Sequence, residues 1–289
     1  MKKCLAVMSL LLALTLPAAS LAETVVTSFF PIYLFAMNLT RGINGLDVHN
    51  LAAPGTGCLH DYQLSTGDMK ALADADLFLI NGAGMESYLS FVFEAFPELP
   101  VTDASVGVEL LEDEDGETPF NPHIWLDAGN AQQMVSNLAD GLMAAWPQYA
   151  DAIAANREDY LTRLSALDTE VREALSGLTR RDIVTFHEAF PYFARAYGLN
   201  VLAVVSREAG DALSAFELTE LIRLVSAAGT PPLFTEPQYS DIAARTIAAE
   251  TGAGIWQLDP IVTADEFTFT LYEDAMRQNL AVLLEALGD

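Results

Sequence analysis

"PQYADAIAANREDYLTRLSALDTEVREALSGL", residues 147–178, is the stretch from which the organisation of the whole chain follows. Its apolar residues recur at helical spacing; they are Ile153, Tyr160, Leu164, Leu167, Val171 and Leu175. Pro147 is typical of a helix start and Gly177 of a helix end, so the pattern predicts one long helix. At about 1.5 Å per residue, such a helix is a stiff rod of roughly 45 Å, long enough to run along two domains.

Short apolar runs alternate with helical patterns on both sides of this helix. The runs lie at 23–29, 46–52, 75–82 and 99–105 before it, and at 181–186, 200–206, 231–236 and 252–259 after it. Helical patterns between them include 214–229 and 240–252. This alternation is typical of parallel sheets covered by helices. We therefore predict two doubly wound α/β domains, 23–146 and 179–289, joined by a rigid interdomain helix at 147–178.

The first 22 residues have the pattern of a secretory signal peptide. Lys2 and Lys3 precede the apolar run "CLAVMSLLLALTL", and "SLA" before Glu23 resembles a cleavage site. No later run is long and apolar enough to span a bilayer, so we expect a mature chain that is soluble outside the cytoplasm. Cys4 leaves with the signal, and Cys58 then has no partner for an internal disulfide.

The chain is strongly acidic, with a formal charge of −26. Loss of Lys2 and Lys3 with the signal removes two positive charges and makes the mature value −28. Such a chain repels nucleic acid and anionic lipid, and it mildly concentrates cations around itself. Selection for solubility is the simpler explanation of this charge, so it does not by itself indicate a cation site.

Three of the four histidines occupy similar places in this scheme. His60 lies in a loop that leads to a predicted helix near Ser65, and His123 lies in a proline-containing loop before another helix. His187 directly follows a predicted strand and is expected to open a helix. Asp259 ends the last predicted strand and is likewise expected to lie at or just before the start of a helix. Open α/β sheets bind ligands at the carboxyl ends of their strands, so these four side chains are candidates for one site.

The fourth histidine, His49, falls inside a predicted strand and is expected to be structural or on the surface. Taken alone, each of the other histidines would more often be structural too. Together, three imidazoles and one carboxylate form a ligand set suited to a borderline divalent ion, zinc above all. The set would close across the cleft between the two domains.

Four segments also resemble a known family. They are "GCLHDYQLSTGDMKALADADLFLINGAGMESYL", "NPHIWLD", "TFHEAFPYFARAYGL" and "LFTEPQYSDIAARTIAAETGAGIWQLDPI". These segments look like the matching parts of the metal-binding solute receptors of ABC transporters, and most like the zinc-uptake type. The resemblance implies a two-lobed periplasmic receptor that captures a metal ion and delivers it to a membrane permease with its cytoplasmic ATPase. We expect a monomer without enzymatic activity.

The resemblance also implies roles for individual residues. His60, His123 and His187 match the nitrogen ligands, and Asp259 matches a carboxylate that completes the site in several members. Glu236 matches a second carboxylate, for which we expect a hydrogen bond that orients a ligating imidazole, with direct ligation as the alternative. Packing around the site, without contact to the ion, is expected of Tyr62, Trp125 and Phe186.

The sequence departs from the family pattern in three places. The stretch "LLEDEDGETPF" before the second histidine is short and contains no histidine, whereas many zinc receptors carry a long histidine-rich loop there. The disulfide of some members cannot form. Leu59 stands where some members have a polar residue, which leaves Asp259, Glu236 or water for the fourth position. Cys58 has the spacing to ligate, but a lone thiol is more often a small buried hydrophobic residue.

Two other functions remain open at this level. A receptor for manganese or ferrous iron would share the fold, although these ions prefer oxygen ligands over three imidazoles. A secreted zinc hydrolase would also use three histidines with an open position. However, the chain has no H-E-x-x-H motif, since the "HEAF" at His187 lacks its second histidine. An adhesin or signalling module is suggested only by some members of the family.

Overall fold

Two parallel sheets form the framework of the computed structural model, which describes residues 22–52, 62–113, 119–205 and 213–288. The first sheet has the order β2-β1-β3-β4. Its strands are β1 (Glu23–Thr27), β2 (Leu46–Asn50), β3 (Leu77–Ile80) and β4 (Val101–Asp103). We call this sheet with its helices the first lobe. Almost all of the predicted signal peptide lies outside the described residues, as do Cys58, Leu59, His60 and part of the acidic stretch.

The second sheet repeats this arrangement in the order β6-β5-β7-β8 and defines the second lobe. Its strands are β5 (Asp182–Thr185), β6 (Asn200–Val204), β7 (Leu233–Thr235) and β8 (Ile255–Gln257). Neighbouring strands pair in parallel in both sheets. All eight predicted runs are strands, which confirms the predicted fold class. The winding direction reverses between β1 and β3 and between β5 and β7, the places where open α/β sheets bind ligands.

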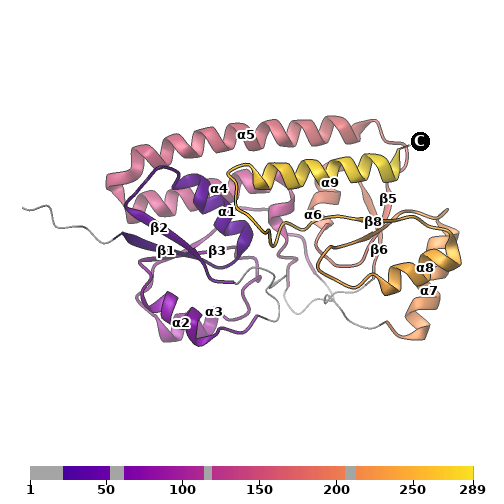
Figure 1. The fold of residues 1–289 in the computed structure, drawn as a ribbon, viewed down its shortest axis with the longest axis horizontal. Helices are drawn as coiled ribbons and strands as arrows, with labels where there is room; N and C mark the ends of the chain where they lie inside the picture. Colours follow the sequence, from indigo (N-terminus) through magenta and orange to yellow (C-terminus); the bar gives the residue numbers. More distant parts are fainter. Residues whose placement is uncertain (1–21, 53–61, 114–118, 206–212, 289) are drawn as a thin grey trace, which may run out of the picture.

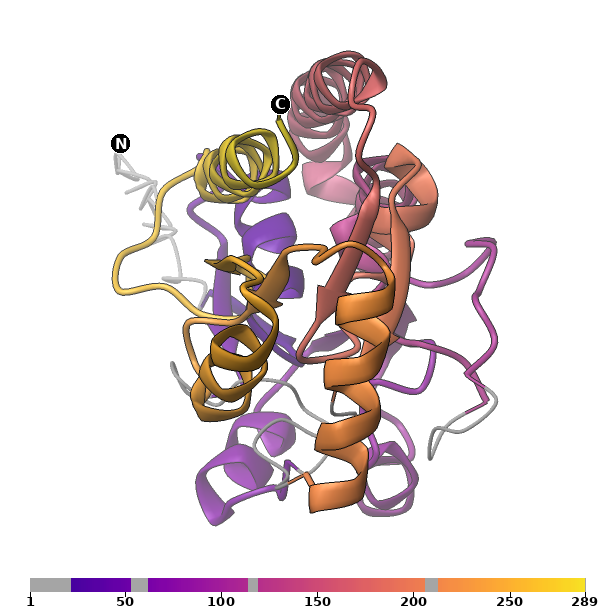
Figure 2. The same ribbon diagram turned by 90° about the vertical axis from the view of Figure 1, so that its right-hand side faces the viewer.

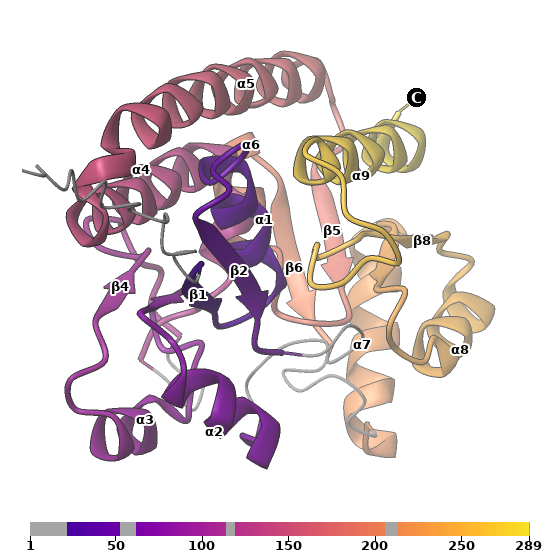
Figure 3. The ribbon, with the colours of Figure 1, turned by 60° about the vertical axis from the view of Figure 1, so that its left-hand side comes forward.

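Helices cover both sheets in the described ranges. They are α1 (Phe30–Leu39), α2 (Thr66–Ala73), α3 (Leu89–Ala95), α4 (Ala128–Ala145), α6 (Pro191–Tyr197), α7 (Ala215–Ala227), α8 (Ile242–Thr251) and α9 (Leu271–Leu287), with 3-10 turns η1 (Ile124–Leu126) and η2 (Pro147–Tyr149). The pair α2 and α3 and the pair α7 and α8 lie on the side of their lobes away from the long helix α5 (Ala150–Ser176) (Figures 1 and 3). None of the described helices has the length and apolar character to cross a membrane.

Helix α5 extends along both lobes, as the sequence predicts (Figures 1 and 3). The six apolar residues predicted for its inner face are the six that the structure buries. Helix α9 runs beside it (Figures 1 and 2). Phe35 of α1 makes edge contacts with Tyr160 of α5, with ring centroids 6.0 Å apart, and with Tyr272 of α9, at 5.3 Å. One continuous apolar core therefore passes from the first lobe into the second, while the domain boundaries at 146 and 178 stay predictions.

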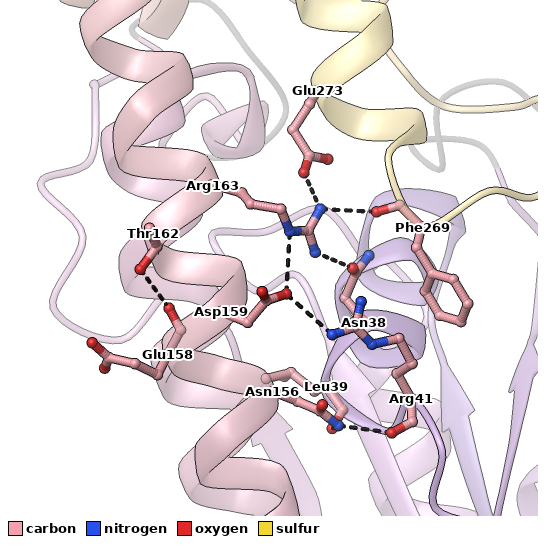
Figure 4. A network of polar contacts seen from close by, with 10 residues as sticks. All are labelled: Asn38, Leu39, Arg41, Asn156, Glu158, Asp159, Thr162, Arg163, Phe269 and Glu273. Atoms are coloured by element: carbon pink, nitrogen blue, oxygen red, sulfur yellow. Dashed lines mark hydrogen bonds and ion pairs between the residues drawn. The ribbon is translucent and has the colours of Figure 1, made fainter.

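The same three helices meet at Arg163 of α5 (Figure 4). Its guanidinium forms an ion pair with Glu273 of α9, and it donates to the Phe269 carbonyl at 3.0 Å and to Asn38 Oδ1 of α1 at 2.5 Å. It also lies 4.5 Å from the centroid of the Tyr160 ring. The Glu273 side chain is only 3% exposed. Burial raises the pKa of its carboxyl group, and Arg163 acts in the opposite direction.

Arg163→Met is expected to lower the free energy of unfolding at pH 7 by about 3 kcal/mol, because it leaves the Glu273 carboxylate buried without its cation. A protonated Glu273 needs no cation. The difference from wild type should therefore shrink as the pH falls through the raised pKa of Glu273. Urea denaturation at pH 7 and pH 5 measures both effects.

Arg277→Met is the matched control, since Arg277 of α9 forms an ion pair with Glu170 of α5 and so joins the same two helices in the reverse sense. The Arg277 Nε–Glu170 Oε2 distance is 3.0 Å, but the two side chains are 44% and 45% exposed. Exposed ion pairs contribute about 1 kcal/mol or less. A loss in the control as large as in Arg163→Met would contradict the role given to burial.

Candidate metal centre

The side chains of His123 and His187 come together from different lobes. Their ring centroids are 5.0 Å apart, and the ring planes are nearly perpendicular, at 85°. His123 immediately precedes η1, and His187 lies two residues beyond the end of β5. The side chains are almost entirely buried, with 1% and 2% of the residue surface exposed. Burial of an imidazole is costly unless its ring nitrogens have partners, so the contacts of the two rings need to be accounted for.

The ring of His123 is held by Asn121. Nδ1 of His123 lies 3.1 Å from Oδ1 of Asn121, and the same oxygen accepts from the backbone N–H of His123 at 2.9 Å. Since a carboxamide oxygen can only accept, the proton of the neutral ring belongs on Nδ1. Nε2 then carries the lone pair, as a metal-binding imidazole requires. The indole of Trp125 packs against this ring, with centroids 5.2 Å apart.

The ring of His187 is held by Glu236, which immediately follows β7. Nδ1 of His187 lies 2.9 Å from Oε1 of Glu236. Because β5 and β7 are neighbours, the two residues leave the sheet side by side at its change of winding direction. Glu236 is 3% exposed, and its Oε2 is buried without a hydrogen-bond partner among the described residues. The contact expected from the sequence between Glu236 and an imidazole is thus present in the geometry.

The expected helix start at His187 is wrong. Residues 186–190 form a loop, and α6 begins at Pro191. Proline suits the first position of a helix, where its missing N–H is not needed.

Asp259 has a different environment from the one expected. Its backbone N–H donates to Oδ1 of Asn279 at 2.8 Å, and its carbonyl accepts from Nδ2 of Asn279 at 2.7 Å. Its Oδ1 accepts from the N–H of Ile261 at 2.7 Å, and Ile261 has the left-handed φ of 61°. Such a backbone is strained for a β-branched residue and persists only where neighbours enforce it. Burial raises the pKa of the Asp259 carboxyl group. The next helix, α9, begins only at Leu271, so the expected helix start after Asp259 is wrong.

The described residues bring together only part of the predicted ligand set. Asp259 borders a cavity of about 610 Å³ whose lining includes Thr235, Gln257 and Asn279 but neither histidine. Within the described ranges, no three His, Cys, Asp or Glu side chains are close enough to form a metal-binding group. His60 lies outside these ranges. The four-ligand set of His60, His123, His187 and Asp259 therefore stays a prediction.

Trp125 has a larger role than the packing predicted from the sequence. It is fully buried, and its indole Nε1 donates to the carbonyl of Pro260 in the second lobe at 2.8 Å. Its own carbonyl accepts from the hydroxyl of Tyr272 in α9 at 2.6 Å. Trp125 thus joins the loop of His123 to the turn of Asp259. The clue in the sequence is that a buried tryptophan N–H needs an acceptor.

The other aromatic residues assigned to the site have partners elsewhere. Tyr62 packs edge-on against Tyr88 and donates to Asp68 at 2.9 Å. Burial, with a contribution from Asp68, raises the pKa of Tyr62 to about 12. Phe186 packs on a smaller core beneath α7 and α8. Their packing around a metal ion stays a prediction. His49 is on the surface of β2, 3.1 Å from Asp47, as expected.

A buried carboxylate that the sequence analysis missed stabilises the loop after β3. Glu86 is 4% exposed and accepts from the N–H groups of Asn81 at 2.7 Å and Gly82 at 3.2 Å. Asn81 in turn donates to the carbonyl of Pro122, next to His123, at 3.0 Å. Burial raises the pKa of Glu86 to about 7. The loop of His123 is therefore anchored to the first sheet as well as to the second lobe.

Comparison with known proteins gives consistent matches. A family model described as zinc-uptake complex component A, periplasmic, matches residues 25–286. The zinc-binding protein AdcA of Streptococcus pyogenes is 32% identical over 287 residues, which cover 90% of this chain and 55% of AdcA. The chain thus spans about half the length of this relative.

Solved structures match over nearly the whole chain. The crystal structure of ZnuA has a TM-score of 0.80 and 27% identity, and covers 92% of this chain and 100% of its own. The structure of FpvC from Pseudomonas aeruginosa in complex with Mn²⁺ has a TM-score of 0.80 and 25% identity, with coverage of 92% and 98%.

Trp125→Phe is expected to lower the free energy of unfolding by about 1–3 kcal/mol, because it leaves the Pro260 carbonyl without its donor while an aromatic ring stays in the core. Urea denaturation followed by circular dichroism measures this loss. Trp146→Phe is the control: Trp146 is 5% exposed, and its indole makes no hydrogen bond among the described residues. Equal losses in both variants would show that ring volume, and not the link to Pro260, is responsible.

Proposed function

This chain belongs to the periplasmic zinc-uptake complex component A family, and we propose that it captures a divalent metal ion, Zn²⁺ before others, for delivery to an ABC-transporter permease. The metal is cargo and the chain is not an enzyme. One observation carries the proposal: two buried imidazoles, one from each lobe, face each other with their centroids 5.0 Å apart. Capture by side chains from both lobes suits a receptor that must enclose its ligand.

The spacing of the two rings supports a shared zinc ion. Zn–N bonds are about 2.0–2.1 Å and structural zinc sites are tetrahedral, so the centroids of two imidazoles on one zinc lie about 5 Å apart. His123 and His187 have this separation. In both rings Nδ1 faces an acceptor, Asn121 or Glu236, which assigns the metal-binding lone pair to Nε2. The rest of the proposed ligand set is His60 and a fourth donor, either Asp259, Glu236 or water.

The two acceptors differ in charge, and this difference should make His187 bind zinc more strongly than His123 does. Glu236 presents a carboxylate oxygen to His187, while Asn121 presents a neutral amide oxygen to His123. A carboxylate partner raises the basicity of a ligating imidazole more than a neutral one does. His187 is thus the stronger nitrogen donor of the pair.

A manganese or iron receptor is the alternative within the same family. FpvC has been solved with Mn²⁺, so the fold also accommodates harder ions. Such ions prefer carboxylate oxygens. In this chain the two described nitrogen donors are close together, and the cavity that Asp259 borders is not lined by either of them, which supports the zinc assignment.

Calorimetric titration of the metal-free protein with Zn²⁺, in competition with a chelator, tests the proposal. We expect one ion per chain, a dissociation constant below micromolar and weaker binding of Mn²⁺. Saturation at 1,000 times the dissociation constant should add about 4 kcal/mol to the free energy of unfolding. Failure to bind zinc below micromolar would contradict the proposed function, and tighter binding of Mn²⁺ would favour the alternative.

His187→Ala and His123→Ala should each weaken zinc binding by at least about 10-fold, because each removes one nitrogen donor. His49→Ala is the matched control, since His49 is exposed in β2 and pairs with Asp47. The three variants are compared in the same chelator competition. Wild-type affinity in His187→Ala would rule out His187 as the nitrogen donor of the second lobe.

A further inference from the structure

We propose that Asn121 is a positioning residue, which fixes the ring of His123 and ties it to the loop that carries His187. It does not touch the ion. The consequence for metal binding rests on the proposed function, whereas the orientation of the His123 ring does not.

The side chain of Asn121 connects both histidine loops at once. It is 2% exposed. Its Oδ1 accepts from the backbone N–H of His123 at 2.9 Å and lies 3.1 Å from Nδ1 of the ring. Its Nδ2 donates at 2.9 Å to the carbonyl of Glu188, the residue after His187. One carboxamide therefore spans the junction of the lobes beside the two imidazoles.

The backbone of Asn121 is also held from both lobes. Its N–H donates to the carbonyl of Leu111 at 2.9 Å. Its carbonyl accepts at 2.8 Å from the hydroxyl of Tyr192, which is fully buried in α6. The same hydroxyl accepts from the N–H of Leu111 at 2.9 Å. All four polar groups of Asn121 are thus used, so its carboxamide has a fixed orientation.

The chemistry of this position requires both an acceptor and a donor. A carboxylate could accept from His123, but it would face the Glu188 carbonyl with a second acceptor. An aliphatic side chain would satisfy neither neighbour and would leave buried polar groups unpaired. Asparagine meets both requirements with a short side chain that loses little conformational freedom. This pairing of functions distinguishes Asn121 from Glu236, which acts on His187 alone among the described contacts.

The first test needs no metal. Nitrogen-15 NMR of the imidazole rings in metal-free wild type should show His123 as the Nδ1–H tautomer, because Asn121 Oδ1 can only accept. Asn121→Ala should lose this single tautomer, and Asn121→Asp should keep it. A wild-type His123 with its proton on Nε2, or an unchanged tautomer in Asn121→Ala, would overturn the proposal.

The second test uses Zn²⁺ affinity and the visible spectrum of bound Co²⁺, which reports the geometry around the ion. Asn121→Ala should weaken zinc binding by about 10–100-fold and alter the Co²⁺ bands, as the loss of an imidazole's hydrogen-bond partner does elsewhere. Asn121→Asp retains the acceptor for His123 but loses the donor to the Glu188 carbonyl, so it should restore the Co²⁺ bands and only part of the affinity. Co²⁺ bands in the aspartate variant that are no closer to wild type than those of the alanine variant would overturn the proposal.

Asn137→Ala is the matched control for general loss of structure. Asn137 of α4 donates to the carbonyls of Ala104 and Val106, both at 2.8 Å, and its removal costs a similar number of hydrogen bonds in the first lobe. In the Asn137→Ala variant, the tautomer of His123, the zinc affinity and the Co²⁺ spectrum should match those of wild type. Equal effects in Asn137→Ala and Asn121→Ala would overturn the positioning role. If wild type itself fails to bind zinc, the proposed function is contradicted. The NMR measurement of the His123 tautomer in the metal-free protein then still tests whether Asn121 orients the ring.

Discussion

The contact between two imidazoles from different lobes constrains the whole molecule. His123 and His187 can stay 5.0 Å apart only if the lobes do not shift relative to each other by more than a fraction of that distance. The burial of the inner face of α5 against both lobes provides this stiffness, and α9 packs alongside it. Polar contacts then define the local geometry: Trp125 reaches Pro260, and Asn121 reaches Glu188. Apolar burial thus sets the distance between the lobes, and hydrogen bonds set the orientation of the rings.

The fold could be predicted from the sequence because its signals are local. Apolar runs separated by helical patterns identify the eight strands, and the spacing from Ile153 to Leu175 identifies the buried face of α5. His187 could be selected because it follows a predicted strand, and His123 because it lies in a proline-containing loop before a predicted helix. The helix starts predicted at His187 and after Asp259 are wrong. Helix α6 begins only at Pro191, and the residues after Asp259 form a turn in which Ile261 has a strained backbone.

The contacts that organise the site join residues far apart in the chain, and periodicity carries no information about them. Asn121 and Glu188, Trp125 and Pro260, and Arg163 and Glu273 become partners only after the lobes have assembled. Asparagine, glutamate and arginine are mostly exposed in proteins, so the residue types of Asn121, Glu188, Arg163 and Glu273 do not predict their contacts. Glu236 could be assigned to an imidazole from the resemblance to metal-binding solute receptors, whereas the sequence marks Asn121 only by its position two residues before His123.

The unequal division of the core has a consequence for how the chain opens. The large core runs through α1, α4, α5, α9 and both sheets, so the lobes cannot lose their packing independently. Among the described residues, the smaller core beneath α7 and α8 contains six buried apolar residues: Val184, Val205, Val225, Leu233, Ile247 and Ala253. Local opening is easiest where few apolar contacts must be broken. The packing of α7 and α8 against the second lobe is therefore expected to open before the large core does, and the amide hydrogens of these two helices are expected to exchange with solvent first.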